Sequence, residues 1–160
     1  MTSTTSPLPS QYLDQEKQVT ARLAAALLQE QALLSGNGEA DEIPAVISEK
    51  AKIVAEMAGL ADHRHKVLAS LGFAASENGM QDWLDQHGSE ADKGIWDDLF
   101  ALAQAARETN RVNGLLVGKQ MAINQNALKI LQGHANVGGS FYGPDGSSSV
   151  RTSGRPLGVG

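Results

Sequence analysis

His63 and His65 are the residues of this sequence that most resemble a metal-binding pair. Histidines that share one ion on a helix are normally four residues apart, because positions i and i+4 lie on the same face. Positions i and i+2 point about 160° apart, so these two imidazoles cannot bind one ion together. We therefore expect no metal site here and interpret both side chains as solvated surface histidines.

Other residues with catalytic potential are also poorly arranged for chemistry. In the pairs Asp97-Asp98 and Asp41-Glu42, the adjacent carboxylates diverge by about 100° around a helix axis. His87 and His134 have no nucleophile or carboxylate partner that the sequence reveals. The glycine-rich C-terminus lacks the spacing of a phosphate-binding loop. The sequence thus predicts neither an enzyme nor a bound cofactor.

The composition favours a helical protein. The chain has 160 residues, no cysteine, 4% aromatic residues and a formal net charge of −5, which excludes disulfides and thiolate metal sites. The acidic balance argues against nucleic acid as a partner. No apolar run approaches the ~18 residues of a membrane span, and the Thr/Ser/Pro-rich start does not resemble a secretory signal. We therefore expect a cytoplasmic protein with no membrane insertion.

Two long helices are predicted in the first half of the chain. The first covers residues 11–34, with Ser10 as its N-cap and the glycines of Ser35-Gly36-Asn37-Gly38 at its end. The second begins with Asp41 as its N-cap and stops at Gly72. Its apolar residues form two adjacent seven-residue rows, which are Val46, Ile53, Leu60, Val67 and Ile47, Val54, Ala61, Leu68. Such a broad apolar face predicts an antiparallel partner helix.

A short third helix is predicted over residues 76–87. Asn78 and Gln81 could form a capping box near its start. Ser89 and Asp92 have the same spacing after the next glycine, so we expect a further helix to begin there.

The fourth helix is predicted from about residue 90 to residue 132, with Gly133 at its end. Polar residues lie in the seam where a core is expected: Asn110, Asn113, Gln120 and Asn124. Apolar residues from Leu115 to Leu131 cover most of the circumference. A helix that is apolar all round either packs centrally in a core or binds a partner. Both remain open; we favour a groove or strip for another protein's amphipathic segment.

The chain is therefore divided into a flexible start (residues 1–9), a helical domain (10–133) and a tail (134–160). Glycine and serine dominate the tail, which cannot bury enough apolar area to offset its ordering entropy. We expect it to be disordered. One island stands out in it, Phe141-Tyr142-Gly143-Pro144-Asp145-Gly146.

Several of these stretches resemble one known family. The run Asn110-Arg111-Val112-Asn113-Gly114-Leu115-Leu116 is followed by Asn124, Leu128 and Leu131, and then by Tyr142-Gly143-Pro144-Asp145-Gly146. This pattern resembles the C-terminal signature of FlgN-type flagellar export chaperones. Further segments that resemble the family are Ser48-Glu49-Lys50, His63-Arg64 through Leu71-Gly72, and Trp96-Asp97-Asp98-Leu99. The resemblance spans roughly residues 10–146.

The resemblance implies a cytoplasmic, non-enzymatic chaperone of flagellar type III secretion. The implied fold is all-α, a long antiparallel helical hairpin or bundle with a short third helix and a long, mobile C-terminal helix. The implied partners are the hook–filament junction proteins FlgK and FlgL, whose amphipathic C-terminal segments it would bind. The implied surface comprises Val112, Leu115, Leu116, Val117, Ile123, Asn124, Leu128 and Leu131, and the seam residues Asn110 and Asn113 would add amides that bond a docked helix.

The tail island has its own implied partner, the export-gate protein FlhA. Tyr142 would dock to the gate, with Gly143 and Pro144 fixing the local turn. A second hypothesis stays open for the whole chain, namely a structural coiled-coil protein that self-associates through the asparagine-bearing seam.

Overall fold

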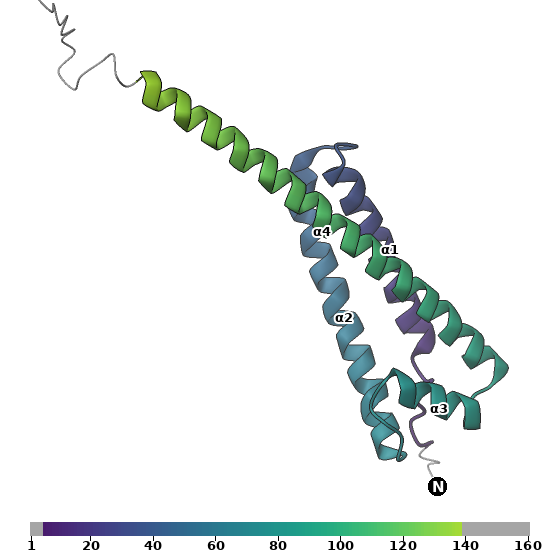
Figure 1. The fold of residues 1–160 in the computed structure, drawn as a ribbon. Coiled ribbons are helices and arrows are strands. Elements are labelled where there is room, and N and C mark those ends of the chain that lie inside the picture. Colours follow the sequence, from purple (N-terminus) through teal and green to yellow (C-terminus); the bar gives the residue numbers. More distant parts are fainter. Residues whose placement is uncertain (1–4, 139–160) are drawn as a thin grey trace, which may run out of the picture. The chain divides into compact units, whose positions relative to one another are not determined.

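The described residues, 5–138 of the computed structural model, form four α-helices and one 3-10 turn, which confirms the all-α prediction (Figure 1). The elements are α1 (Leu13–Leu34), η1 (Ala40–Glu42), α2 (Ile43–Ser70), α3 (Glu77–His87) and α4 (Glu90–Gly138). The chain divides into two units, residues 1–117 and 118–160. The first unit, called the body below, contains α1, α2, α3 and the first part of α4. The predicted tail island, with Tyr142, Gly143 and Pro144, and the expected tail disorder lie outside the described residues.

α1 and α2 form the predicted antiparallel hairpin, and their backbones run closest together among the long helices of the body. Gly36 and Gly38 adopt positive φ angles of 83° and 157° in the connection, which is the predicted glycine turn. Gly72 ends the second helix with a φ of 85°, as expected. Glycine adopts this left-handed region without the steric cost that a Cβ imposes.

Two predicted helix starts are wrong. Ser10 is not an N-cap; α1 begins after Tyr12, and the backbone N–H of Leu13 bonds to the Ser10 carbonyl in a preceding turn. Asp41 does not cap α2, because it lies inside the 3-10 turn η1 and Glu42 occupies the cap position without a side-chain bond. In both places a backbone turn leads into the helix, so no side-chain acceptor is used.

The start of α3 also differs from its prediction. Ser76 is the N-cap, and its Oγ accepts a hydrogen bond from the Gly79 N–H at 3.1 Å. Gln81 bonds instead to Asp85, so the predicted Asn78–Gln81 capping box is wrong. Gly79 is required for a steric reason: a Cβ there would lie 1.8 Å from the Ala74 carbonyl oxygen.

The capping box that starts α4 is confirmed. Ser89 Oγ accepts from the Asp92 N–H at 3.1 Å, and the Asp92 carboxylate faces the Ser89 N–H at 3.5 Å. The predicted stop at Gly133 is wrong, because α4 continues to Gly138. One glycine costs a helix only about 1 kcal/mol relative to alanine, and no proline follows it within this stretch.

The core of the body lies in two clusters. The larger is at the end where α3 covers the hairpin and joins side chains from all four helices: Leu13, Leu68, Met80, Trp83, Leu84, Trp96 and Leu99. The smaller follows the seam between α1 and α2 and contains Val19, Ala26 and Ile53. α3 therefore acts as a lid that closes one end of the hairpin.

The two apolar rows of α2 have different environments. Most of the first row is buried, with Val46, Ile53 and Val67 each 6% exposed or less. In the second row Leu68 is buried, but Ile47 and Val54 are about half exposed. The expectation that both rows pack in the hairpin is therefore correct for only part of the second row.

Replacing Gly79 with alanine tests the α3 cap. Because the added Cβ meets the Ala74 carbonyl, we expect Gly79→Ala to lower the free energy of unfolding by about 1–3 kcal/mol. Gly94→Ala is the matched control: it lies in α4 with nothing within 4 Å of its added Cβ, so it should raise that free energy by up to about 1 kcal/mol. Urea denaturation of both variants measures the difference. Equal effects would contradict a steric role for Gly79.

Candidate partner-binding surfaces

A buried guanidinium joins all four helices at the α3 end of the body. Arg64 of α2 is 4% exposed and donates from Nε to Glu16 of α1 at 3.0 Å. Its Nη2 donates to Glu77, the first residue of α3, at 3.1 Å. The guanidinium carbon also lies 4.9 Å from the ring centre of Trp96 on α4, a cation–π distance. The side chain is structural, because its charge holds these elements together.

A second polar cluster lies toward the other end of the hairpin. Asn113 of α4 is 1% exposed; its Nδ2 donates to the Leu27 carbonyl at 2.9 Å and to Glu30 Oε1 at 3.1 Å. Lys50 of α2 donates to the other Glu30 oxygen at 2.6 Å. Asn113 was predicted as a binding residue, but in this conformation both amide hydrogens are directed to α1.

The other predicted residues of the body are more accessible. Asn110, Leu115 and Val117 are exposed, and Leu115 reaches 63%. Val112 and Leu116 are half-buried. In the last turns of α4 before residue 118, one side of the helix therefore faces the hairpin. The apolar side chains of Leu115 and Val117 on its other sides are exposed to solvent.

The second unit, considered by itself, is a single described helix that ends at Gly138. Its large apolar side chains are all more than half exposed: Met121, Ile123, Leu128, Ile130 and Leu131. Asn124 is exposed among them. At about 100° per residue, these apolar positions share roughly half of the circumference, and Gln125, Asn126 and Lys129 occupy the other half. We call this exposed apolar side, Met121 to Leu131, the apolar arc.

Two adjoining hollows lie in the body between α2 and α4, above α1. The first, about 210 Å³, is lined by Glu16, Thr20, Met57, Ala61, Arg64, Glu77, Leu99 and Ala103. The second, about 330 Å³, is lined by Thr20, Leu23, Leu27, Lys50, Val54, Met57, Ala103, Ala106, Arg107 and Asn110. They share Thr20, Met57 and Ala103, so together they form one groove. Of the predicted site residues, Asn110 lines it.

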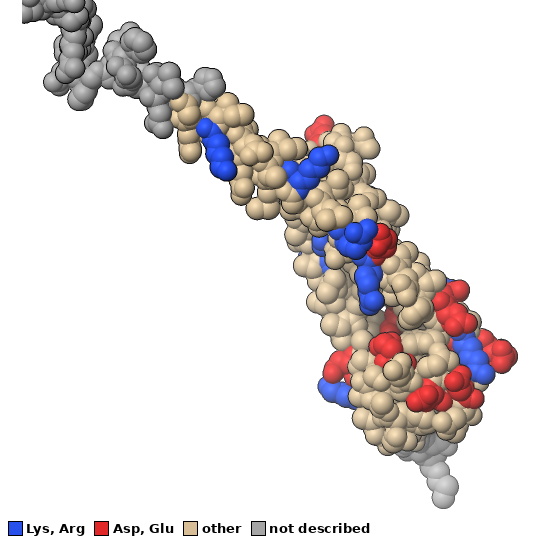
Figure 2. Space-filling view, viewed as in Figure 1, with Lys and Arg blue, Asp and Glu red and all other residues tan. Residues whose placement is uncertain are grey.

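Charge is distributed unevenly over the body. Acidic side chains gather near α3 and the first part of α4 (Figure 2). The acidic residues in this stretch of the sequence are Glu77, Asp82, Asp85, Glu90, Asp92, Asp97 and Asp98. A hydrogen bond to Asp98 at 2.8 Å raises the pKa of Lys17. Farther along α4, a hydrogen bond from Arg111 lowers the pKa of Glu108 and raises that of Arg111. Both pairs are exposed to solvent, so each contributes little to stability.

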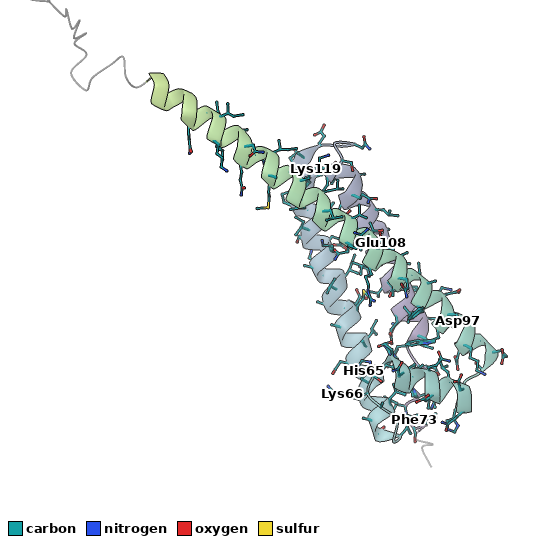
Figure 3. The ribbon with its side chains drawn as sticks, in the orientation of Figure 1. His65, Lys66, Phe73, Asp97, Glu108 and Lys119 are labelled. Atoms are coloured by element: carbon teal, nitrogen blue, oxygen red, sulfur yellow. The ribbon has the colours of Figure 1, made fainter. Side chains whose placement is uncertain are left out.

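The two histidines are partly buried, whereas we expected solvated surface side chains. The His63 ring packs edge-on against Tyr12 at a centroid distance of 5.0 Å, and its Nε2 is buried. His65, near the end of α2 (Figure 3), has its Nε2 3.2 Å from Glu77. The helix pattern did not reveal that α1 and α3 would cover this turn. Within the described residues, no group of three or more His, Cys, Asp and Glu is placed to hold a metal ion.

The buried structural charges of the body were not predicted from the sequence. Arg64, Glu16 and Glu30 each lie inside an apolar stripe at helical spacing, where an exposed charge is not expected. Opposite charges inside the stripes of two antiparallel helices are a signal of buried pairing, and this signal could have identified them. No pattern in the sequence indicated the groove, because the groove depends on the distance between α4 and α2.

These features define a class of protein. It is a helical body with structural charges, an open groove and an exposed apolar helix, and its candidate sites are surfaces for other proteins. No helix in the described part of the chain is long and apolar enough to span a membrane.

Comparison with known proteins identifies the family. The family model described as "FlgN protein" matches residues 8–149. The chain is also 28% identical over 149 residues to the Flagella synthesis protein FlgN of Yersinia enterocolitica serotype O:8, biotype 1B, covering 92% of this chain and 94% of that protein. A second Yersinia enterocolitica protein of the same name matches equally. No solved structure matches the chain. The chain belongs to the FlgN family of flagellar chaperones.

Asn113→Asp tests the cluster around Glu30. The change replaces a donor by a carboxylate beside the Glu30 carboxylate and the Leu27 carbonyl, so we expect a loss of about 2–4 kcal/mol in the free energy of unfolding. Adding Glu30→Gln to this variant should recover part of the loss, because it removes the like charge. Asn110→Asp, on an exposed position one turn earlier, should change stability by at most about 0.5 kcal/mol. A similar loss in both single variants would contradict the assignment.

Proposed function

We propose that this chain is a cytoplasmic export chaperone for the hook–filament junction proteins FlgK and FlgL. It would bind their amphipathic C-terminal segments, prevent premature assembly and deliver them to the export-gate protein FlhA. Membership of the FlgN family supports the general role. The finer assignment is our inference from the surfaces described above.

The observation that carries the proposal is the apolar arc. Five large apolar side chains in the second unit are each more than half exposed. An apolar patch of this kind on a protein that remains in water is typical of a surface that another protein covers. A linear strip along one helix suits an amphipathic helix, which places its own apolar face along the strip.

The polar residues in and near the strip have a role in this mechanism. The Asn124 amide lies among apolar side chains and can both donate to and accept from the backbone end or a side chain of a docked helix. A single buried amide in a helix seam lowers stability but selects one register of pairing. The amide would therefore select one alignment of the cargo segment.

Delivery needs a second contact, and we assign it to Tyr142 with Gly143 and Pro144. A tyrosine side chain combines a large apolar ring with a polar tip at a low cost in side-chain entropy, which suits a shallow docking pocket. The residues between Leu131 and Tyr142 include three glycines, so the tether would allow cargo binding and gate docking at the same time.

The first test changes the apolar arc. Ile123→Asp combined with Leu128→Asp puts two charges on it, and we expect affinity for a FlgK C-terminal peptide to fall by about a hundredfold, because each burial contributes about 1.5 kcal/mol or more. Gln125→Asp with Asn126→Asp adds the same charge on the polar side and should leave affinity within about threefold. Isothermal titration with the full chain measures both. Equal affinities would contradict the assignment.

The second test separates cargo binding from delivery. Tyr142→Ala should reduce binding of the chaperone–cargo complex to the cytoplasmic domain of FlhA by about tenfold or more, since it removes an aromatic anchor. Affinity for the FlgK peptide should be unchanged. Tyr142→Phe should retain most gate binding if the ring provides most of the energy. If Tyr142→Ala weakens both interactions, the two sites are not separable.

Self-association is the alternative function that a specific observation favours. Asparagines inside an apolar helical seam are typical of coiled coils with a fixed number of strands. Sedimentation equilibrium at several concentrations, with and without the FlgK peptide, distinguishes the two. A stable oligomer that the peptide does not dissociate would favour the structural coiled coil over the chaperone.

A further inference from the structure

We propose that the groove between α2 and α4 is a second cargo contact with a defined polarity. A helical stretch of about four turns from the cargo's amphipathic segment lies in it, with its N-terminal end toward Glu77 and its C-terminal end toward Arg107. This inference rests on the proposed function, because the occupant is the cargo that the apolar arc also binds.

The groove is open because α4 does not pack closely on α2. The close backbone pairing in the body is between α1 and α2, and α4 is held through side chains such as Trp96 and Asn113. This loose packing leaves the two hollows of about 210 and 330 Å³, and residues of α1 form their floor. From Arg64 to Lys50 along α2 the groove is about 21 Å long, the length of a four-turn helix.

Apolar side chains line both long sides of the groove, and charged residues lie at its two ends. On α2, Val54 is 49% exposed although its seven-residue row predicts burial. On α4, the facing residues are small, Ala103 and Ala106. A large side chain on one wall opposite small ones on the other leaves room for the anchor residues of an incoming helix.

The two ends of the groove differ in charge. At one end Glu16 and Glu77 share the single guanidinium of Arg64, so negative charge is in excess. At the other end Arg107 forms no ion pair with any residue of the described range, while Lys50 is already paired with Glu30. A helix carries partial positive charge at its N-terminus and partial negative charge at its C-terminus. The groove therefore favours the proposed orientation, in which the docked helix is parallel to α4 and antiparallel to α2.

The Arg64 side chain supplies a second polar feature at the acidic end. It lines the first hollow, and its Nη1 is buried without an acceptor among the described residues. A buried donor left unpaired costs about 1–3 kcal/mol. The N-cap residue of a docked helix, commonly Ser, Thr, Asn or Asp, carries an oxygen that can accept this hydrogen bond.

The binding experiment uses the full chain and a synthetic FlgK C-terminal peptide. Val54→Glu places a charge in the groove, and Ala103→Phe fills it without adding charge; we expect each to weaken peptide binding by about tenfold or more. Leu28→Glu is the matched control, because Leu28 is an equally exposed apolar residue of the body that lines neither hollow. It should change affinity by at most about twofold. Circular dichroism and thermal unfolding verify that each variant is folded.

The polarity is tested with spin labels. The chain has no cysteine, so Asn78→Cys and Arg111→Cys each give a single attachment site at one end of the groove. A label at position 111 should broaden the NMR signals of residues at the C-terminal end of the docked stretch, and a label at position 78 those at its N-terminal end. The reverse pattern would overturn the proposed orientation.

The outcomes separate this inference from the proposed function. If Ile123→Asp with Leu128→Asp abolishes binding while Val54→Glu and Ala103→Phe bind as the wild type does, the groove assignment is overturned and the apolar arc remains. If the unmodified chain does not bind the peptide, the proposed function itself is overturned. Weakening by both groove variants, with the Leu28→Glu control unaffected, supports the inference.

Discussion

The arrangement of the body depends on the guanidinium of Arg64. It is withdrawn from water and contacts carboxylates from α1 and α3 and the indole of Trp96 from α4. A buried charge is tolerated only when its partners are held in place, so the positions of these elements are mutually constrained. The apolar cluster around Leu68, Met80 and Leu84 supplies burial energy but could accept several packings. The charge selects one of them, and with it the distance at which α4 lies.

The helices and their order could be predicted from the sequence, because glycine turns, the Ser89–Asp92 box and apolar spacing are local signals. Helix boundaries were less predictable: Ser10, Asp41 and Gly133 are residue types that often begin or end helices, yet backbone turns or continued helical bonding determine the ends. The apolar arc was predictable as an excess of apolar residues. The groove and the burial of Asn113 were not, because both depend on the spacing of helices that are distant in sequence.

α4 illustrates how one helix can contribute different properties along its length. Near its start it contributes Trp96 and Leu99 to the apolar cluster. In the middle of the body it presents alanines, which leave space, and then Asn113, which fastens it to α1. After residue 117 its large side chains are exposed to solvent. The first part of α4 therefore stabilises the body, and the part after residue 117 keeps apolar side chains available for binding. Because different segments do these two tasks, packing a core does not use up the apolar surface that a partner needs.

The two ion pairs of the hairpin, whose carboxylates are both buried, would also act as a register check during folding. Glu16–Arg64 and Glu30–Lys50 are two heptads apart on both helices. If α2 slipped by one heptad along α1, the apolar rows of the two helices would still face each other. The loss of apolar burial would therefore disfavour the slipped alignment only weakly. The same slip would place Glu16 opposite Met57 or Leu71 and Glu30 opposite Ile43 or Met57, which leaves two carboxylates buried without a cation. Misaligned hairpins would thus be unstable intermediates that reopen, and the aligned hairpin is the one that persists long enough for α3 and α4 to dock.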